Sequence, residues 1–177
     1  LDIVASGSQK GYMIPPGLSF ISVSEKAWNA CDKSNLPKFY LDLKYYKKSL
    51  NNNSNPYTPA VNLVFALEES LKMMQEEGLE NIFQRHEKHK LAVSNAIQIL
   101  NLKLFADKNS LSPSITAIES TQIDAEAFRK IIKDKFDILL AGGQDHLKGK
   151  IFRVGHLGYI NDRDIIAAIS AIGLTLL

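Results

Sequence analysis

Two long helical patterns separated by one glycine, Gly78, constrain the fold of this chain more than any other feature. The first begins at Thr58-Pro59, because threonine is a good N-cap and proline is favoured at the first helical position. We expect Gly78 to end this helix in the left-handed conformation and a second helix to follow. Apolar or buried-face residues recur at steps of three and four, first at Val64, Leu67, Leu71 and Met74, then at Ile82, His86, His89, Val93, Ile97 and Leu100.

Short strand patterns lie on both sides of these helices. The strand candidates are residues 3–5, 18–23, 102–105, 114–119 and 151–154. Further helices are expected at 24–30 and from Asn161 or Asp162 to the end of the chain. Another helix is expected to start at the N-cap Asp124. Its buried face would consist of Phe128, Ile131, Ile132 and Phe136. The segment 31–55 is polar and rich in lysine, and its asparagine tract reads as a loop. The order of elements predicts an α/β or α+β fold.

The composition is that of a globular protein with a small-molecule partner. Of the 177 residues, 45% are hydrophobic and 23% are charged, enough for a core of about one domain. A net charge of +2 is too small to predict a nucleic-acid or phospholipid surface. The apolar run 165–177 is shorter than the roughly 20 residues of a membrane span. Cys31 is the one cysteine, which excludes a disulfide or a multi-cysteine cluster within the chain and fits a reducing cytoplasm.

The chain starts at Leu1 in the middle of a pattern, without Met, and we expect a truncated or cleaved product.

Lys10 is the first candidate for chemistry. It lies in Ser6-Gly7-Ser8-Gln9-Lys10-Gly11, directly after a strand and among small residues. An amine that attacks a carbonyl must be partly neutral, and small neighbours let a flat cofactor approach the backbone. A solvated lysine in an ordinary turn is the alternative reading of the same six residues.

Three ordered motifs resemble those of the class-V aminotransferases, which include alanine– and serine–glyoxylate aminotransferases. The first is the stretch 6–17, in which Gly-Ser-Gln-Lys10 is followed by Pro-Pro-Gly17. The second is Thr58-Pro59, and the third is the glycine-flanked strand around Arg153, residues 148–158. The resemblance covers nearly the whole chain. It implies the C-terminal part of a fold-type I enzyme dependent on pyridoxal phosphate, with residues 1–71 at the edge of the large α/β domain and 72–177 forming a small C-terminal α+β domain.

The resemblance also implies a role for each matching residue. Lys10 would hold pyridoxal phosphate as a Schiff base and shuttle the α-proton, and Gln9 would contact the cofactor phosphate. Thr58 would reach a phosphate in the neighbouring protomer's site of a homodimer, and Arg153 would hold the carboxylate of an amino-acid or keto-acid substrate. The remaining site residues would precede Leu1, so we expect the fragment alone to be inactive. Some members of the family have a tyrosine in the phosphate-binding site where this chain has Asn55. The resemblance therefore assigns no residue to that part of the site.

Other candidates have ordinary explanations. His86-Glu87-Lys88-His89 lacks the spacing of a zinc-protease helix, Cys31 has no cysteine-loop signature, and Gly142-Gly143 lacks a nucleotide-binding spacing and reads as a turn. His156 suits either a substrate pocket or a structural hydrogen bond.

Two further hypotheses remain beside the transaminase. Some cyanobacterial relatives carry the name small subunit of a soluble hydrogenase, which would imply an accessory or electron-transfer role. Nickel–iron and iron–sulfur sites need several thiolates, however, and this chain has only Cys31. The other hypothesis is a non-catalytic remnant that dimerises.

Overall fold

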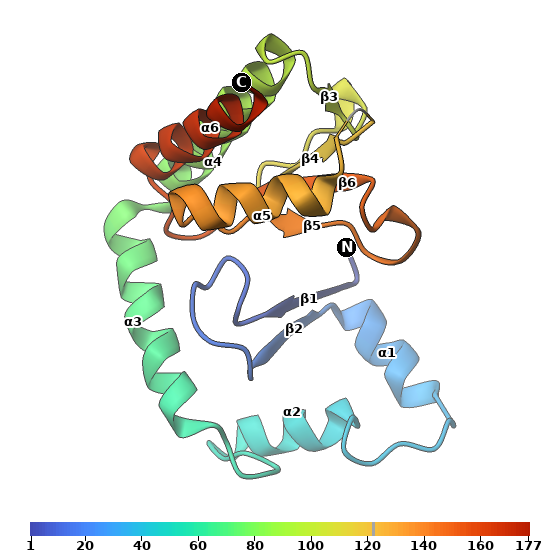
Figure 1. Ribbon diagram of the computed structural model, residues 1–177. Coiled ribbons are helices and arrows are strands. Elements are labelled where there is room, and N and C mark those ends of the chain that lie inside the picture. Colours follow the sequence, from blue (N-terminus) through green and yellow to red (C-terminus); the bar gives the residue numbers. More distant parts are fainter. Residues whose placement is uncertain (122) are drawn as a thin grey trace. The chain divides into compact units, whose positions relative to one another are not determined.

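A computed structural model describes residues 1–121 and 123–177 and divides them into two compact units, Leu1–Met73 and Met74–Leu177. Figure 1 labels the helices and strands of both units. Among the described residues, no helix combines the length and the apolar character required to cross a membrane.

The first unit is built on an antiparallel hairpin. Its strands β1 (Ile3–Gly7) and β2 (Ser19–Val23) pair in the register Ile3↔Val23 to Gly7↔Ser19. Three helices follow: α1 (Glu25–Lys33), α2 (Leu43–Asn51) and α3 (Val61–Glu77), the last of which continues past the boundary of the unit. The strands at 3–5 and 18–23 and the helix near 24–30 are thus where the sequence predicted them.

The first unit buries little. In Leu1–Met73, all of which the structure describes, the buried side chains are those of Ser8 and Ser70, and no apolar side chain is buried. Apolar side chains are instead exposed on the hairpin, with Ile3 at 54% and Ile21 at 49%, and around the chain near Phe39, which is 71% exposed. A folded monomer rarely leaves so much apolar surface uncovered unless another surface packs on it.

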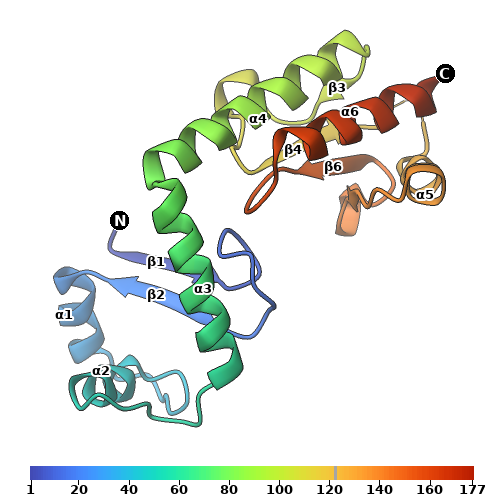
Figure 2. The ribbon, with the colours of Figure 1, turned by 90° about the vertical axis from the view of Figure 1, so that its left-hand side faces the viewer.

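The second unit is a four-stranded antiparallel sheet covered by helices. The strands β3 (Lys103–Leu104), β4 (Ile115–Glu119), β5 (Ala141–Gly142) and β6 (Ile151–Gly155) lie in the order β3-β4-β6-β5. The helices are α4 (Leu79–Ile99), α5 (Ala125–Phe136) and α6 (Asp162–Leu176). Figure 2 shows α4 and α6 on one side of β4 and β6.

Alternation along the strands sets the two faces of this sheet. Ile118 on β4, and Phe152 and Val154 on β6, point into the core with Val93 and Ile97 of α4. The intervening residues Arg153 and Ala117, which are cross-strand partners, are only partly buried. Because neighbours along a strand point to opposite faces, Arg153 lies on the face away from the helices.

The helix caps of the second unit agree with the sequence. Asp124 caps α5 by accepting hydrogen bonds from the backbone of Glu126 and Ala127. Asn161 caps α6 and forms a capping box with Asp164. The expected stripe of α4 is buried at its centre, where His89, Val93 and Ile97 lie. The prediction that Ile131 lies on the buried face of α5 is wrong, because this side chain is 41% exposed. Phe128 and Ile132 fill the side of the helix that faces the sheet.

Three other expectations need correction. The segment 31–55 is not all loop, because it contains helix α2. Asp42 caps this helix, and Asn51, the first asparagine of the tract, is its last residue. Helix α3 begins at Val61 rather than at Pro59, because the first carbonyl to accept an α-helical bond is that of Ala60, from the amide of Val64. Gly78 has φ of 82° and ψ of 137°, so it is extended with positive φ and serves as the N-cap position of α4 rather than as a left-handed helical cap.

Candidate active site

The loop that carries Lys10 is held at its base by Ser8. This side chain is fully buried and its hydroxyl donates a hydrogen bond to the carbonyl of Pro15 at 2.7 Å and accepts one from the amide of Leu18 at 3.2 Å. The backbone amide of Ser8 also donates to the carbonyl of Leu18 at 3.0 Å. The two ends of the loop are therefore tied together immediately before Lys10.

Gln9 and Lys10 lie at the tip of this braced loop with exposed side chains. The amide of Lys10 donates to the carbonyl of Gly7 at 3.1 Å, which closes a tight turn. A Cβ atom at Gly7 would lie 2.9 Å from Oε1 of Gln9, so the missing side chain leaves room for the Gln9 amide over the backbone. Residues 7–17 contain no carboxylate. The exposed amine of Lys10 and the exposed side-chain amide of Gln9 suit a ligand that carries an aldehyde and a phosphate.

Helix α3 packs on the far side of the same loop. Ser70, which is 4% exposed, donates from its hydroxyl to the carbonyl of Tyr12 at 2.5 Å. Gly17 has φ of 145°, and a Cβ atom there would lie 2.5 Å from Cδ1 of Leu63. Leu63 and Ser70 are seven residues apart and share one helix face. The Lys10 loop is thus held both at its base and along its length.

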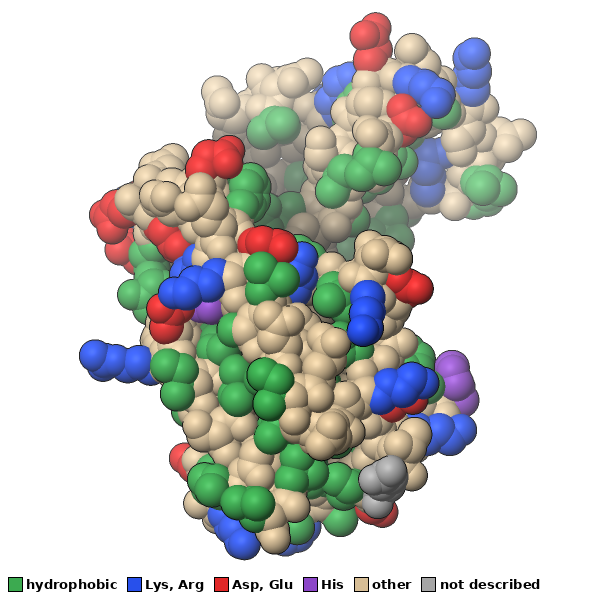
Figure 3. All heavy atoms as spheres, turned by 90° about the horizontal axis from the view of Figure 1, so that it is seen from above, with side chains coloured by type: hydrophobic (Ala, Val, Ile, Leu, Met, Phe, Trp, Pro, Cys, Tyr) green, Lys and Arg blue, Asp and Glu red, His purple; other side chains and the backbone are tan. Residues whose placement is uncertain are grey.

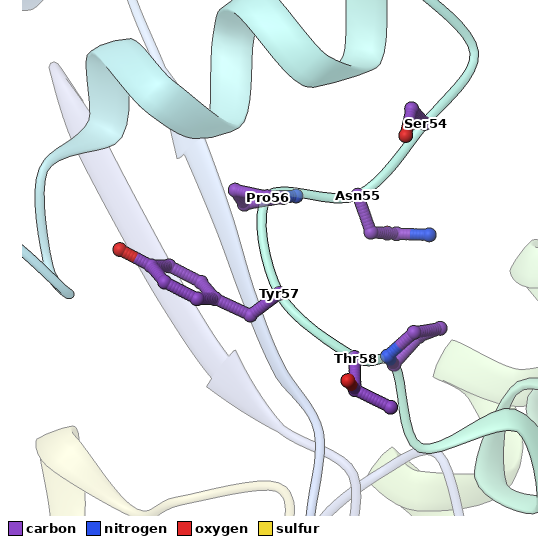
Figure 4. A pocket seen from close by; sticks show the side chains of 6 residues that line it. Ser54, Asn55, Pro56, Tyr57 and Thr58 are labelled. Atoms are coloured by element: carbon purple, nitrogen blue, oxygen red, sulfur yellow. The ribbon is translucent and has the colours of Figure 1, made fainter.

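Thr58 lies in the extended segment that leads into α3, three residues before the helix. Figure 4 shows the open hollow that this segment forms, with the ring of Tyr57 pointing away from the side chain of Asn55. The hydroxyl of Tyr57 lies 3.4 Å from the carbonyl of Phe39, and its ring centroid is 4.6 Å from that of Tyr40. Tyr57 therefore belongs to an aromatic cluster, while the exposed hydroxyl of Thr58 is available to a ligand.

Arg153 belongs to the second unit and lies at the centre of β6. Its Nε donates to the carbonyl of Gly142 on β5 at 2.8 Å. Among the described residues its Nη1 and Nη2 atoms have no hydrogen-bond partner. The side chain is partly buried, so one edge of the guanidinium is fixed to the sheet and the other is free to bind an anion.

His156 is structural in this fold. It is fully buried, its Nδ1 donates to the carbonyl of Pro113 at 3.1 Å, and its Nε2 lies 2.9 Å from the hydroxyl of Thr116. Nδ1 must carry a proton to donate to this carbonyl, so in the neutral ring Nε2 accepts a hydrogen bond from the hydroxyl of Thr116. Burial is the main cause that lowers the pKa of His156 below its ordinary value.

The other candidates also have structural contacts. His86 Nδ1 donates to the carbonyl of Ile82 at 2.7 Å, and His89 Nε2 lies 3.0 Å from a carboxylate oxygen of Asp162. Among the described residues, no three His, Cys, Asp or Glu side chains are grouped as metal ligands. Gly142 lies in β5 rather than in a turn, which corrects the expectation for that pair, and Gly143 follows it directly.

The structure brings Gln9 and Lys10 together on one loop and places Thr58 in the same unit, whereas Arg153 is in the other unit. Sequence reasoning missed Ser8 and Ser70 as supports of the Lys10 loop. A serine carries no local signal of burial, and these two do not bond their immediate neighbours: Ser8 bonds residues 7 and 10 positions later, and Ser70 bonds a residue 58 positions earlier.

The fold of the whole chain is that of part of an aminotransferase. The crystal structure of alanine–glyoxylate aminotransferase from Nostoc sp. superposes on 100% of this chain with a TM-score of 0.91 and 27% sequence identity, and the match covers 48% of that enzyme. The α/β fold is therefore the C-terminal part of the fold-type I architecture, as the sequence predicted.

A family model described as aminotransferase class-V matches residues 1–157, and the chain belongs to this family. A protein from Synechococcus sp. (strain PCC 6716) named soluble hydrogenase, small subunit, is 58% identical over 97% of this chain and 45% of its own length. The L-aspartate–glyoxylate aminotransferase of Paracoccus denitrificans is 36% identical over 96% of this chain and 43% of its own length. The chain thus spans about half the length of the relatives it matches.

Proposed function

We propose that the protein is a pyridoxal-phosphate-dependent transaminase that exchanges an amino group between a small amino acid, such as alanine or serine, and a keto acid such as glyoxylate. The observation that carries this proposal is the position of Lys10 on a loop braced by Ser8, within a chain that belongs to the class-V aminotransferase family.

Lys10 is the proposed covalent attachment point and proton carrier. When bound, pyridoxal phosphate supplies an electron sink that makes the α-proton of an amino acid acidic. The Nζ atom of Lys10 would take up that proton and release it again, for which the amine must stay close to the substrate carbon. The hydrogen bonds of Ser8 to Pro15 and Leu18 support this role, because they hold the backbone next to Lys10 in one position.

Gln9 and Thr58 are the proposed phosphate ligands. Both side chains are exposed and can donate hydrogen bonds to an anion, through the Nε2 amide of Gln9 and the Oγ1 hydroxyl of Thr58. We propose that Thr58 serves the site of a second protomer in a homodimer. The uncovered apolar surface of the first unit, which includes Ile3 and Phe39, supports packing against another protein surface.

Arg153 is the proposed carboxylate ligand. A guanidinium group binds a carboxylate through two parallel N–H donors, and both substrates of a transaminase carry a carboxylate. The free Nη1 and Nη2 atoms of Arg153 support this assignment, since the third nitrogen already bonds Gly142.

We propose that residues 1–71 complete the edge of the large cofactor domain and 72–177 form the small domain. The rest of the cofactor site would then lie outside this chain, so we expect the 177-residue chain to be inactive alone. Turnover by the isolated chain would contradict this division of the site.

The single cysteine, Cys31, supports a cytoplasmic location.

The name of the Synechococcus relative suggests a second candidate, an accessory subunit of a hydrogenase. Thiolate ligands for such metal centres would have to come from a partner chain, because Cys31 is the one cysteine here. Covalent trapping of a bound cofactor separates this role from transamination.

Borohydride reduction of the full-length protein tests the proposal. Reduction fixes a bound pyridoxal group on its lysine as a stable pyridoxyl adduct. Trypsin does not cut after the modified lysine, so an adduct on Lys10 would appear in a peptide that continues to Lys26. Lys10→Arg should lose the adduct, and Lys26→Arg, which removes an exposed lysine, should keep it. An unmodified Lys10, or an adduct on another lysine, would overturn the proposal and leave the accessory role.

Alanine, serine and aspartate should then be compared as amino donors with glyoxylate as the acceptor. The names of similar proteins give different amino donors, aspartate and alanine, but the same acceptor, glyoxylate. Glyoxylate is therefore kept as the acceptor while the donor is varied. Half-reaction rates with each donor, followed by the absorbance of the cofactor, measure the preference.

A further inference from the structure

The short strand β5 lies between two arginine side chains. On one side, Arg153 Nε donates to the carbonyl of Gly142 at 2.8 Å. On the other, Arg129 of α5 donates from its Nε to the carbonyl of Leu140 at 2.8 Å. The two arginines thus bond carbonyls two residues apart, and Ala141–Gly142 is the segment that connects them. A two-residue strand has few bonds of its own, so these side chains contribute much of what fixes it.

Arg129 is held in turn by Glu126. Its Nη1 lies 2.8 Å from Oε2 of Glu126, one turn earlier on α5, and the arginine side chain is 22% exposed. Partial burial strengthens such a pair relative to a pair in open solvent. The neighbouring pair Lys130–Asp134 on the same helix is 77% and 53% exposed and contacts no strand that the structure describes.

Gly142 leaves the space that the Arg129–Glu126 pair occupies. A Cβ atom at Gly142 would lie 2.5 Å from Nη1 of Arg129 and 2.8 Å from Oε1 of Glu126. Real Cβ atoms do not approach other atoms so closely, so a side chain at this position would displace the ion pair or the strand. The pair, the glycine and the carbonyl acceptor of Arg153 therefore form one packed unit.

This contact also restricts how Arg153 can bind an anion. A guanidinium can offer a carboxylate either the Nε and one Nη, or the two Nη atoms. The Nε of Arg153 is already bonded to Gly142, so the first arrangement is blocked while β5 stays in place. The two Nη atoms are left as the paired donors, and their direction depends on the position of the Gly142 carbonyl.

We propose that Arg129, paired with Glu126, is a positioning residue for Arg153: it fixes β5, and β5 in turn directs the two Nη donors of Arg153 toward the substrate carboxylate. The inference rests on the proposed function, in which Arg153 binds that carboxylate. Arg129 itself does not contact substrate in this account.

The test compares five variants of the full-length protein in steady-state transamination. Arg153→Lys reports on the carboxylate ligand itself. Arg129→Lys and Arg129→Gln weaken the support from the helix side, and Gly142→Ala displaces the same pair from the strand side. Lys130→Gln is the matched control, since it removes an exposed ion pair from the same helix. Thermal unfolding midpoints and the yield of the pyridoxyl adduct show which variants fold and hold cofactor.

We expect Arg129→Gln and Gly142→Ala to raise KM for both the amino acid and the keto acid about tenfold, the effect of weakening one charged hydrogen bond, while kcat changes less. Arg129→Lys should recover part of the loss and Lys130→Gln should match the wild type. A merely structural role would lower the unfolding midpoint and the active fraction without moving KM.

The outcomes separate the inference from the proposed function. If Arg153→Lys raises KM but the Arg129 and Gly142 variants do not, the positioning role is wrong and the role of Arg153 stands. If Arg153→Lys leaves KM unchanged, Arg153 is not the carboxylate ligand, and the positioning role of Arg129 is wrong with it. An equal effect of Lys130→Gln would also overturn the positioning role, because it would show a general response of α5.

Discussion

Arg85 binds both carboxylate oxygens of Glu77, with Nε 2.6 Å from Oε1 and Nη2 2.9 Å from Oε2. Its remaining nitrogen, Nη1, donates to the carbonyls of Gly158 and Ile160, each at 2.9 Å. One side chain therefore joins the end of α3, the start of α4 and the loop between β6 and α6. This loop follows directly on the strand that carries Arg153, so Arg85 helps to define the second unit around the candidate site.

Replacing Arg85 should destabilise the protein markedly. The pair is largely shielded, with side chains 21% and 29% exposed, and Arg85→Ala would leave a carboxylate and two carbonyls without their donor. We expect a loss of about 2–4 kcal/mol in the free energy of unfolding, measured with urea. Lys72→Gln, which removes an exposed pair with Glu68, is the control and should change stability by less than about 0.5 kcal/mol. A similar small effect for Arg85→Ala would show that the network contributes nothing.

The same ion pair predicts a response to acid. The Arg85 guanidinium lowers the pKa of the Glu77 carboxyl below its ordinary value of 4.5. A lowered carboxyl pKa stabilises the fold at pH values above 4.5, and this contribution disappears as the pH falls through the lowered pKa. Glu77→Gln should therefore lower the free energy of unfolding at pH 7. Between pH 5 and pH 3, the free energy of unfolding should fall less in this variant than in the wild type. Urea unfolding at several pH values measures the difference, and parallel curves would contradict it.

Local signals in the sequence were sufficient for much of the second unit. Asp124 and Asn161 cap α5 and α6 because an Asp or Asn side chain satisfies free amides wherever a helix starts. The strands at β4 and β6 follow from alternation that one buried face imposes. These features depend on neighbours a few residues away, and a single sequence contains that information.

The first unit was harder to predict because its helices pack through distant partners. Val64 and Leu71, expected on the buried face of α3, are 47% and 41% exposed, whereas Leu63 and Ser70 contact the Lys10 loop. The contact with the loop selects a face that is rotated by about one residue from the apolar stripe. The sequence did not predict helix α2, because its three lysines and the asparagine tract that starts at its end obscure the pattern that begins at the cap Asp42.

The candidate site divides in the same way. Motif resemblance located Lys10, Gln9, Thr58 and Arg153, and their roles remain predictions. The residues that support them could not be found from the sequence: Ser8 acts through Pro15 and Leu18, and Arg129 acts through the carbonyl of Leu140, which directly precedes β5. Such supports are visible only once the chain is folded, because their partners carry no shared motif.

The buried ring of His156 predicts a second pH dependence. Burial lowers the pKa of His156 below its ordinary value of 6.5, so the unfolded chain binds a proton more readily than the folded one. Stability should be complete above pH 6.5 and fall below it, at a rate of at most about 1.4 kcal/mol per pH unit for one proton. His156→Asn should reduce the slope between pH 7 and pH 5, whatever its effect at pH 7. His146→Asn, which removes an exposed histidine, should leave the slope intact, and an unchanged slope in His156→Asn would refute the assignment.

Gly143 has a steric role that alanine cannot fill. A Cβ atom there would overlap the backbone carbonyl of Leu147, so the loop after β5 would have to move. We expect Gly143→Ala to cost about 2–3 kcal/mol in unfolding free energy, as other strained substitutions do. Gly155→Ala is the control, because its Cβ would meet only Cδ2 of Leu157 at 3.6 Å, an ordinary contact. Equal unfolding midpoints for the two variants would contradict the steric argument.

Removing the hydroxyl of Ser8 should loosen the Lys10 loop selectively. Ser8→Ala removes a fully buried hydroxyl and leaves the partly buried carbonyl of Pro15 and amide of Leu18 without this partner, which should cost about 1–3 kcal/mol. Ser6→Ala removes an exposed hydroxyl two residues earlier on β1 and should be neutral. Amide hydrogen exchange locates the effect, since Leu18 should exchange faster in Ser8→Ala while the amides of α5 stay protected. Uniformly faster exchange in both units would indicate global destabilisation instead, and unchanged exchange at Leu18 would show that the loop is held by its backbone bonds alone.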